Sequence, residues 1–560
     1  MSLLARVFAA RGLTDAAACE AFLNPTLRQL HNPSLMPNLD RAAERLLAAA
    51  KAGEPIVIYG DYDVDGITAT AILYHTLKAI VPECNLRTYV PHRLEEGYGL
   101  NAEAIAELAA GGAKVIVSVD CGITATGPAV VARAAGVDLI VTDHHNLPGD
   151  GAFPDAYALV HPRLPGSAYP FGELCGAGVA YKLAWRLCTL ACGSERVSEP
   201  LRNLLCTDLL ALASLGVIAD IVPLVGENRV MAFYGLRQIR HSYMEGLKAL
   251  VAAAGLDGEK VGEEDVGFKL GPRLNACGRM GHAREAVELL TTATGARATE
   301  IAEELTRKNE ERRRVEREIF EQACQMVEWE GMHRDDRRAI VLSHADWNPG
   351  VVGIVCSRLV ERFGRPTILM REHDGECHGS GRSIDGYSLH AGLEHCAGHL
   401  KSFGGHDMAA GLKLESSRMR EFVDAFIAHA NERIAVEELT GAVGYDTDAD
   451  IGELTTTEVQ QLLRLAPFGR ENPSIRLRIP AARIAGRAQT MGKNNKHLLF
   501  QLSSSAGSMR WLRVVGWNWA DRIDEVPAGR VVDVLIAPKL NEWQGNARVE
   551  AELIDLRPAD

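Results

Sequence analysis

Short apolar runs alternate with helix-like segments between residue 54 and about residue 145. Runs of β-branched and other apolar residues predict strands at residues 56–58, 86–90, 115–119 and 139–141. Between them, apolar residues at helical spacing predict helices at residues 68–81, 101–110 and 128–135. Such alternation requires right-handed crossovers, so we expect a parallel sheet with helices on both faces.

The pattern changes at several points along the rest of the chain. Residues 296–330 form one long, highly charged helical stretch in which acids and bases are interspersed, as expected for a solvated spacer helix that joins two domains. Alternating patches near the C-terminus, such as residues 497–502 and 509–515, predict strands. The expected division is an N-terminal helical brace at 1–53, a parallel-sheet domain at 54–290, a connecting helix at 291–332, a second α/β domain at 333–437 and a β-barrel at 438–560.

Composition places the protein among soluble globular chains. Of its 560 residues, 47% are hydrophobic and 24% charged. No signal-peptide core and no uncharged membrane-length apolar run is found, and the 12 cysteines include no Cys-x-x-Cys pair, so we expect a reducing, cytoplasmic setting without membrane association. The net charge of −13 argues against whole-surface affinity for nucleic acid but leaves room for a local basic track.

Acids and histidines follow directly after three of the predicted strands. Asp61, Asp63 and Asp65 follow the first, Asp120 another, and Asp143-His144-His145 the last. The carboxyl ends of parallel strands share one edge of a sheet, so these side chains should converge there. Asp220, in an otherwise apolar run, is either a fourth contribution or a helix terminator.

A solvated acidic turn is the alternative to a metal site at 61–65, but four converging segments favour the metal. Carboxylates suit Mg²⁺, and added imidazoles tilt the preference towards Mn²⁺. So many acids exceed the needs of one ion. We therefore expect two divalent ions, a natural arrangement for attack on a phosphoryl centre.

Two later regions carry donors for an anionic ligand. Glycine turns at 379–383 and 403–406 let backbone N–H groups approach phosphate oxygens, and Arg382 adds a charged contact. From Asn472 to Ala520 there is no Asp or Glu, while basic residues and tryptophans are frequent. A basic β surface with aromatic rings is typical of an OB-type platform for single strands, although the tryptophans could all be core residues.

Several motifs together resemble the DHH phosphoesterase superfamily and, within it, bacterial exonucleases specific for single-stranded DNA. The motifs that carry the superfamily resemblance are Asp63-x-Asp65-Gly66 and residues 118–122, 142–145 and 216–220. Those that carry the exonuclease resemblance are residues 90–93, 96–100, 271–279 and 347–354. The resemblance runs from about residue 55 to the C-terminus and implies an α/β fold: a parallel-sheet DHH domain, a long helix, a second α/β domain of the DHHA1 type and a C-terminal OB-type barrel.

The resemblance also implies roles for individual residues. It implies that metal is held by Asp61, Asp63, Asp65, Asp120, His144 and Asp220. It implies that His145 contacts the scissile phosphate and that Asp143 orients an imidazole. The residues expected to contact phosphates or nucleic acid are Arg93, Arg273, Arg279, Gly381, Arg382, Ser383, His406, Arg487, Lys493, Lys496, Arg510 and Arg513.

The activity implied is hydrolysis of single-stranded DNA from its 5′ end to 5′-mononucleotides, in DNA repair and recombination. A monomer that works with a helicase and a single-stranded-DNA-binding protein is expected. Two alternatives stay open. One is a DHH-type phosphodiesterase that acts on short RNA, cyclic dinucleotides or pyrophosphate. The other is a non-catalytic strand-binding protein on the same fold.

Overall fold

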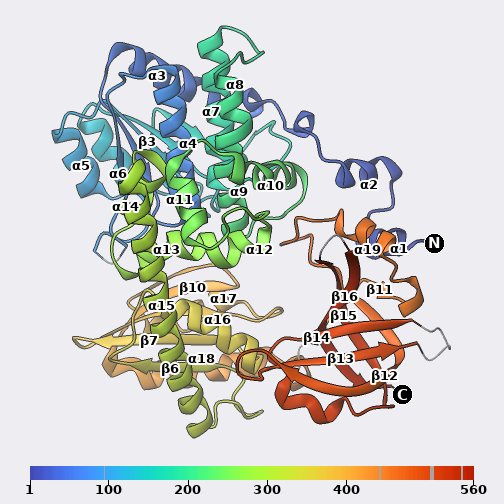
Figure 1. Ribbon diagram of the computed structural model, residues 1–560. Coiled ribbons are helices and arrows are strands. Elements are labelled where there is room, and N and C mark those ends of the chain that lie inside the picture. Colours follow the sequence, from blue (N-terminus) through green and yellow to red (C-terminus); the bar gives the residue numbers. More distant parts are fainter. Residues whose placement is uncertain (94, 440–442, 505–509, 544–545, 560) are drawn as a thin grey trace.

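The computed structural model describes residues 1–560 except 94, 440–442, 505–509, 544–545 and 560. Two α/β lobes lie one above the other, joined by the long helix α15, and a β-barrel lies beside them (Figure 1). The chain passes from the upper lobe through α15 to the lower lobe and then into the barrel.

The first lobe contains the predicted parallel sheet, with strand order β2-β1-β3-β4-β5. Its strands are β1 (Ile56–Gly60), β2 (Leu86–Tyr89), β3 (Val115–Val119), β4 (Asp138–Thr142) and β5 (Ala158–Val160). One face packs on the helices α3 (Leu39–Ala52), α4 (Val64–Ile80) and α7 (Gly176–Cys192). The other packs on α5 (Ala102–Ala110) and α6 (Thr126–Ala134). The prediction of helices on both faces is confirmed. Helix α5 is capped by Asn101 and Gly111.

A further group of helices packs against α4, α7 and one another. Its members are α8 (Leu201–Leu204), the π-helical turn η3 (Leu205–Leu209), α9 (Leu210–Ala219), α10 (Gly226–Gln238), α11 (Glu245–Ala253), α12 (Glu263–Asp265), the π-helical turn η5 (Val266–Leu270), α13 (Gly271–Met280) and α14 (Arg284–Thr291). Within the described residues, Leu201–Ala219 is the one helical stretch long and apolar enough to cross a membrane, and 67% of its most apolar window is buried inside the fold. It packs against α4, α7 and α10, as a core helix does.

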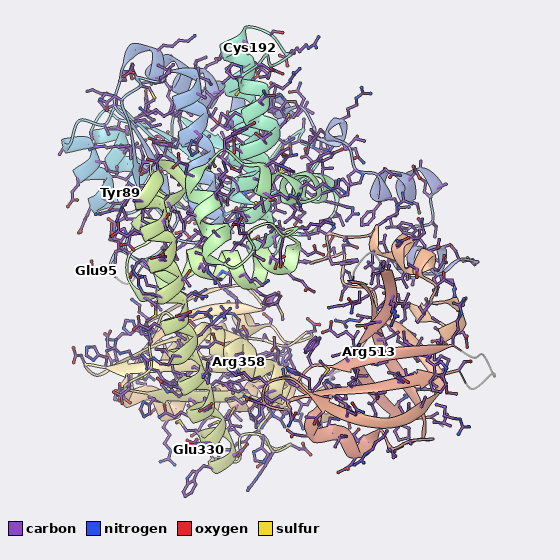
Figure 2. All side chains as sticks on the ribbon, viewed as in Figure 1. Tyr89, Glu95, Cys192, Glu330, Arg358 and Arg513 are labelled. Atoms are coloured by element: carbon purple, nitrogen blue, oxygen red, sulfur yellow. The ribbon has the colours of Figure 1, made fainter. Side chains whose placement is uncertain are left out.

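The connecting helix α15 (Gly295–Trp329) spans both α/β lobes. Its first turns pack into the first core through Ala298, Ile301 and Leu305. Its last turns pack into the second lobe through Ile319 and Val327. Glu330, at the lower end of the helix, is labelled in Figure 2. The expected spacer helix is confirmed, and both of its ends are anchored in hydrophobic cores.

The second lobe is a mixed sheet with order β6-β7-β8-β10-β9, in which only β6 and β7 are parallel. The strands are β6 (Ile340–His344), β7 (Thr367–His373), β8 (Glu376–Arg382), β9 (Ser402–Gly405) and β10 (Ala409–Glu415). The helices α15 and α16 (Val352–Phe363) cover one face. The helices α17 (Leu389–His395) and α18 (Met419–Arg433) cover the other.

The C-terminal lobe is a closed barrel. Its strands are β11 (Thr447–Asp448), β12 (Leu477–Met491), β13 (His497–Ser503), β14 (Trp511–Gly516), β15 (Val531–Trp543) and β16 (Asn546–Pro558). Pairing of β12 with β15 closes the barrel, which is consistent with an OB fold and confirms the predicted fold class. Residue 509, at the start of one expected strand, lies outside the described residues.

Residues 1–53 do not pack as one brace. Helix α1 (Leu3–Ala10) contributes Leu3, Val7 and Phe8 to the barrel core, next to α19 (Thr456–Leu463). Partly buried residues of α2 (Ala16–Leu23) pack against the same core, whereas α3 belongs to the first lobe. The N-terminal segment therefore ties the barrel to the first lobe, which a helical pattern alone does not reveal.

Candidate metal centre and phosphate-binding site

The ends of β1, β3 and β4 bring acids and histidines to one edge of the sheet. Asp61 and Asp63 follow β1, and the Asp63 side chain caps α4 by accepting N–H bonds from Asp65 and Gly66. Asp120 follows β3 with a left-handed φ of 63°, which turns the chain sharply at the strand end. His144 follows β4, and Asp220 is the C-terminal cap of α9.

The distances show that four separated segments meet. His144 Nε2 lies 3.1 Å from Asp120 Oδ1, 3.6 Å from Asp220 Oδ2 and 3.7 Å from Asp65 Oδ2. Oxygens of Asp61, Asp63 and Asp120 also lie within 4.8 Å of one another. All six residues expected to hold metal therefore belong to one cluster. As Asp220 both terminates its helix and joins this cluster, the two interpretations of it are compatible.

The acids are held together against their own repulsion. Burial and the neighbouring carboxylates raise the pKa of Asp61 and Asp120, and the same causes raise the pKa of Asp220 to about 9. Burial lowers the pKa of His144 to about 4, which favours the neutral imidazole that a metal requires. Asp61 Oδ1, Asp120 Oδ1 and His144 Nε2 are buried with no hydrogen-bond partner within the described structure. Carboxylate oxygens and an imidazole nitrogen left unsatisfied in this way fit divalent cations.

Helix α7 fixes the orientation of two of these carboxylates. Its first amides, Gly176 N–H and Ala177 N–H, donate to Asp65 at 2.5 and 2.9 Å. A Cβ on Gly176 would lie 2.5 Å from Asp120 Cβ, so only glycine lets the helix approach Asp120 this closely. The helix N-terminus also carries partial positive charge, which faces the Asp65 side chain.

Replacing Gly176 with alanine is therefore expected to displace Asp120 while the helix persists. Since misplaced supporting groups typically cost about 10- to 100-fold in metal affinity or activity, both should fall by that order. The control is Gly127→Ala, because a Cβ at Gly127 has open space around it. Titration with Mn²⁺ measures the affinity, and an unchanged value in Gly176→Ala would contradict the expectation.

Beside the cluster, Asp143 orients the second histidine. His145 Nδ1 donates to Asp143 Oδ1 at 2.8 Å, and the amides of Ile123, His144 and His145 donate to the same carboxylate. Although burial opposes the charge, these bonds hold the pKa of Asp143 below its ordinary value. Although burial also disfavours the imidazolium, the bond to Asp143 raises the pKa of His145 to about 9.

Tyr98 belongs to the site although no role was expected for it. Its hydroxyl lies 3.1 Å from both ring nitrogens of His145 and donates to the Asp120 carbonyl at 3.3 Å. Gly97 and Gly99 on either side have φ of 84° and 85°, a left-handed turn that lifts the exposed Tyr98 ring over the site. The Gly-Tyr-Gly triplet is the sequence signal that could have identified this residue.

Three arginines gather where the first and second lobes face each other. Burial and the nearby charges of Arg93, Arg312 and Arg382 lower the pKa of Arg279 to about 10. Arg279 donates to the Gly350 carbonyl at 3.0 Å, Arg382 donates to the adjoining Gly381 carbonyl, and Arg93 lies 4.8 Å over the Tyr62 ring. No ion pair is found for these three within the described chain. Crowded, partly desolvated guanidinium groups that lack an ion-pair partner among the described residues are suited to an anionic ligand.

The other residues expected to contact phosphate lie in different surroundings. Arg273 donates to Thr306, Lys269 and Ala253 inside the first lobe and is not part of the arginine group. In the second lobe, the Ser383 hydroxyl donates to the Tyr387 carbonyl, and Gly381 packs against Leu389. His406 reaches across to the first lobe, with its ring 3.1 Å from the Asn146 amide, next to His145.

The barrel presents an exposed basic surface with two exposed tryptophans among its described residues. Arg487, Lys493 and Lys496 are exposed, Trp511 is 62% exposed and Trp517 is 48% exposed. Arg513 on β14 (Figure 2) forms an ion pair with Glu550, and Arg510 donates to the Gly452 carbonyl. The basic track is thus partly neutralised at Arg513, although the exposed Trp511 ring is free to stack on a base.

Three domain families match consecutive parts of the chain. They are "DHH family, N-terminal domain" over residues 55–216, "DHHA1 domain" over residues 336–434 and "RecJ OB domain" over residues 445–555. The matched segments fall within the two α/β lobes and the barrel, and the first of them ends inside α9.

Whole-length relatives and solved structures agree with the domain matches. The chain is 36% identical over 555 residues to the single-stranded-DNA-specific exonuclease RecJ of Bacillus subtilis (strain 168), covering 99% of this chain and 67% of that protein. It is 35% identical over 577 residues to the protein of the same name from Dickeya dadantii (strain 3937), covering 100% and 96%. The crystal structure of RecJ from Thermus thermophilus in complex with Mn²⁺ aligns with a TM-score of 0.80 at 29% identity, covering 100% of this chain and 76% of that one. Its complex with Mg²⁺ aligns with a TM-score of 0.76 at 28% identity, covering 100% and 75%.

Proposed function

The chain belongs to the RecJ family of single-stranded-DNA-specific exonucleases, and on that premise we propose how its own residues carry the reaction. The protein is a metal-dependent nuclease that hydrolyses single-stranded DNA from the 5′ end and releases 5′-mononucleotides. The observation that carries the assignment to this site is the meeting of Asp65, Asp120, His144 and Asp220 around unsatisfied buried atoms.

The acidic cluster holds two divalent ions, Mn²⁺ or Mg²⁺. The residues we propose as ligands are Asp61, Asp63, Asp65, Asp120, His144 and Asp220. When bound, such ions lower the pKa of a coordinated water and balance the charge of the phosphate. Asp65, fixed by the amides of α7, and Asp120, fixed by its turn, keep the ligand set in place before substrate arrives.

His145 is proposed to donate a hydrogen bond to the scissile phosphate. Asp143 accepts the Nδ1 proton and keeps the ring charged near neutral pH. The Nε2 proton, which faces the Tyr98 hydroxyl at 3.1 Å, would turn to a phosphate oxygen that gains charge during hydrolysis when substrate binds. Tyr98 limits the rotation of the imidazole.

The arginine group is proposed to bind the phosphate at the 5′ end of the strand. Arg93 and Arg279 come from the first lobe and Arg382 from the second, so a phosphate between them would join the lobes over the metal site. An anchored 5′ phosphate sets the distance to the scissile bond, which explains release of one nucleotide at a time. His406 closes the same gap by contacting Asn146.

Products from an end-labelled strand test this function. A 5′-labelled single strand supplied with Mn²⁺ should release labelled mononucleotide first, whereas a 3′-labelled strand should shorten progressively. A cyclic dinucleotide assayed in parallel tests the related phosphodiesterase activity. Internal cuts, or preferred hydrolysis of the dinucleotide, would contradict the proposal.

Metal removal should change stability as well as activity. Bound cations relieve the repulsion among Asp61, Asp63 and Asp120, so Mn²⁺ at about 100 times its Kd should stabilise the fold by about 2.7 kcal/mol and raise Tm. Thermal unfolding with Mn²⁺ and with EDTA measures the difference. The variant Asp120→Ala is expected to show no shift, and an equal shift in that variant would place the metal elsewhere.

The finer points of organisation and setting are also proposals. We propose a monomer with domains at 54–290, 333–437 and 438–560, the connecting helix at 291–332 between the first two, and residues 1–23 packed on the barrel domain. It acts in the cytoplasm, where its 12 cysteines stay free, in DNA repair and recombination. A helicase that unwinds duplex and a single-stranded-DNA-binding protein would supply its substrate.

A further inference from the structure

A loop of the barrel domain docks on the segment that carries Asp220. Residues 464–476 join α19 to β12, and residues 220–225 join α9 to α10 in the first lobe. The Leu224 N–H donates to the Arg470 carbonyl at 2.8 Å. The space beside Gly469 is filled by Leu224, whose Cδ1 would lie 2.7 Å from an added Cβ. The loop and the metal-site segment are therefore in close backbone contact.

Arg229 fixes the same loop from the first lobe. It is 2% exposed and donates to the carbonyls of Leu465 at 2.7 Å and Ala466 at 3.2 Å, among others of the loop. Inside the loop, Asn472 donates to the carbonyls of Leu465 and Pro467, each at 2.8 Å. These bonds to consecutive carbonyls hold the loop rigid. Arg470 lies between the bonded carbonyls and Asn472.

The Arg470 side chain has no assigned partner. It is exposed, and within the described chain neither a hydrogen bond nor an ion pair of its guanidinium is found. The Arg470 backbone carbonyl is bonded to Leu224, four residues after the proposed metal ligand Asp220. Ile221, next to Asp220, is 66% exposed with a left-handed φ of 55°, so this part of the metal-site segment faces solvent. A cation without a bonded partner in the described chain thus lies on the barrel loop that docks beside the metal-site segment.

We propose that Arg470 is a substrate-positioning residue that the barrel domain supplies to the catalytic centre. It contacts the backbone phosphate on the 3′ side of the scissile bond. If the arginine group holds the 5′ phosphate on the side of the second lobe, a strand that continues past the metal site towards the barrel would bring its next phosphate to Arg470. The inference rests on the proposed function and adds that full activity requires the docked barrel loop.

Substrate length provides the test. A 5′-phosphorylated dinucleotide has no phosphate beyond the scissile one, whereas a trinucleotide has one. A lost charge-assisted contact changes kcat/KM by roughly 10- to 100-fold. Arg470→Ala should lower kcat/KM to that extent on trinucleotides and longer strands. On the dinucleotide, kcat/KM should stay within about twofold of wild type, a change much smaller than the loss of one such contact causes. Arg470→Lys should recover part of the loss, because it keeps the charge without the planar fork.

The control in the same loop is Arg464→Ala, since the Arg464 side chain is bonded to Asn24 and Gln461. It should cleave both substrates like wild type. Bound Mn²⁺ should be unchanged in Arg470→Ala. A parallel loss on the dinucleotide, a loss of Mn²⁺, or unchanged rates on long strands would each overturn the inference. If the wild-type protein cleaved neither substrate, the proposed function itself would fail.

Discussion

Replacing Asp120 with asparagine should reduce hydrolysis of single-stranded DNA by about 10³-fold or more. The Asp120 carboxylate takes part in two groups of side chains able to hold a metal, one with Asp61 and Asp63 and one with His144 and His145. Removing its charge weakens both groups together, and electrostatic stabilisation is usually the largest single contribution to such a rate. Asparagine is chosen because it tolerates the left-handed φ of 63° at this position.

The comparison needs two measurements. Initial rates with saturating Mn²⁺ give the loss of activity, and fluorescence anisotropy of a labelled strand should show binding within a few-fold of wild type. The control is Asp155→Asn, because Asp155 forms an ion pair with Arg133 at the surface. Loss of a single transition-state donor already lowers the rate by more than about tenfold. If the Asp120 variant retained more than about a tenth of the activity, the ions would be held elsewhere.

Replacing Arg382 with alanine should lower kcat/KM by about 10²-fold on 5′-phosphorylated strands. Burial lowers the pKa of Arg382, as expected for a desolvated guanidinium, and its one hydrogen bond within the described structure is to the adjoining Gly381 carbonyl. Its loss should therefore cost little stability while removing a charged donor from the anion site. The loss should appear mainly as a higher KM if the contact of Arg382 with the 5′ phosphate is equally strong in the ground state and the transition state.

Strands with a 5′ hydroxyl provide the internal comparison. Without a 5′ phosphate, wild type and Arg382→Ala should differ much less, because the proposed contact is absent from both. Arg420→Ala, an exposed arginine on α18 of the same lobe, is the control and should match wild type on both strands. An equal loss on the two strands would assign Arg382 to another part of the substrate.

The barrel core shows why part of the fold could not be predicted. Apolar runs predicted β1, β3 and β4 because buried strands need continuous apolar residues, and the acids after them followed from the rule for parallel sheets. Helix α1 has an ordinary amphipathic pattern. The same apolar face would fit either core, and tertiary contacts such as the bond from Leu3 N–H to Glu458 reveal which one it joins.

The sequence by itself determined the α/β alternation, the strand-end positions of Asp61, Asp120 and His144, and the family, because each is encoded in local spacing. Only the tertiary structure decided that Asp220 lies 3.6 Å from His144, that Arg273 stays apart from Arg279, and that the loop carrying Arg470 reaches the metal site. Distances between residues far apart in the chain depend on how helices pack on the sheet and on how the barrel docks. No local pattern carries that information.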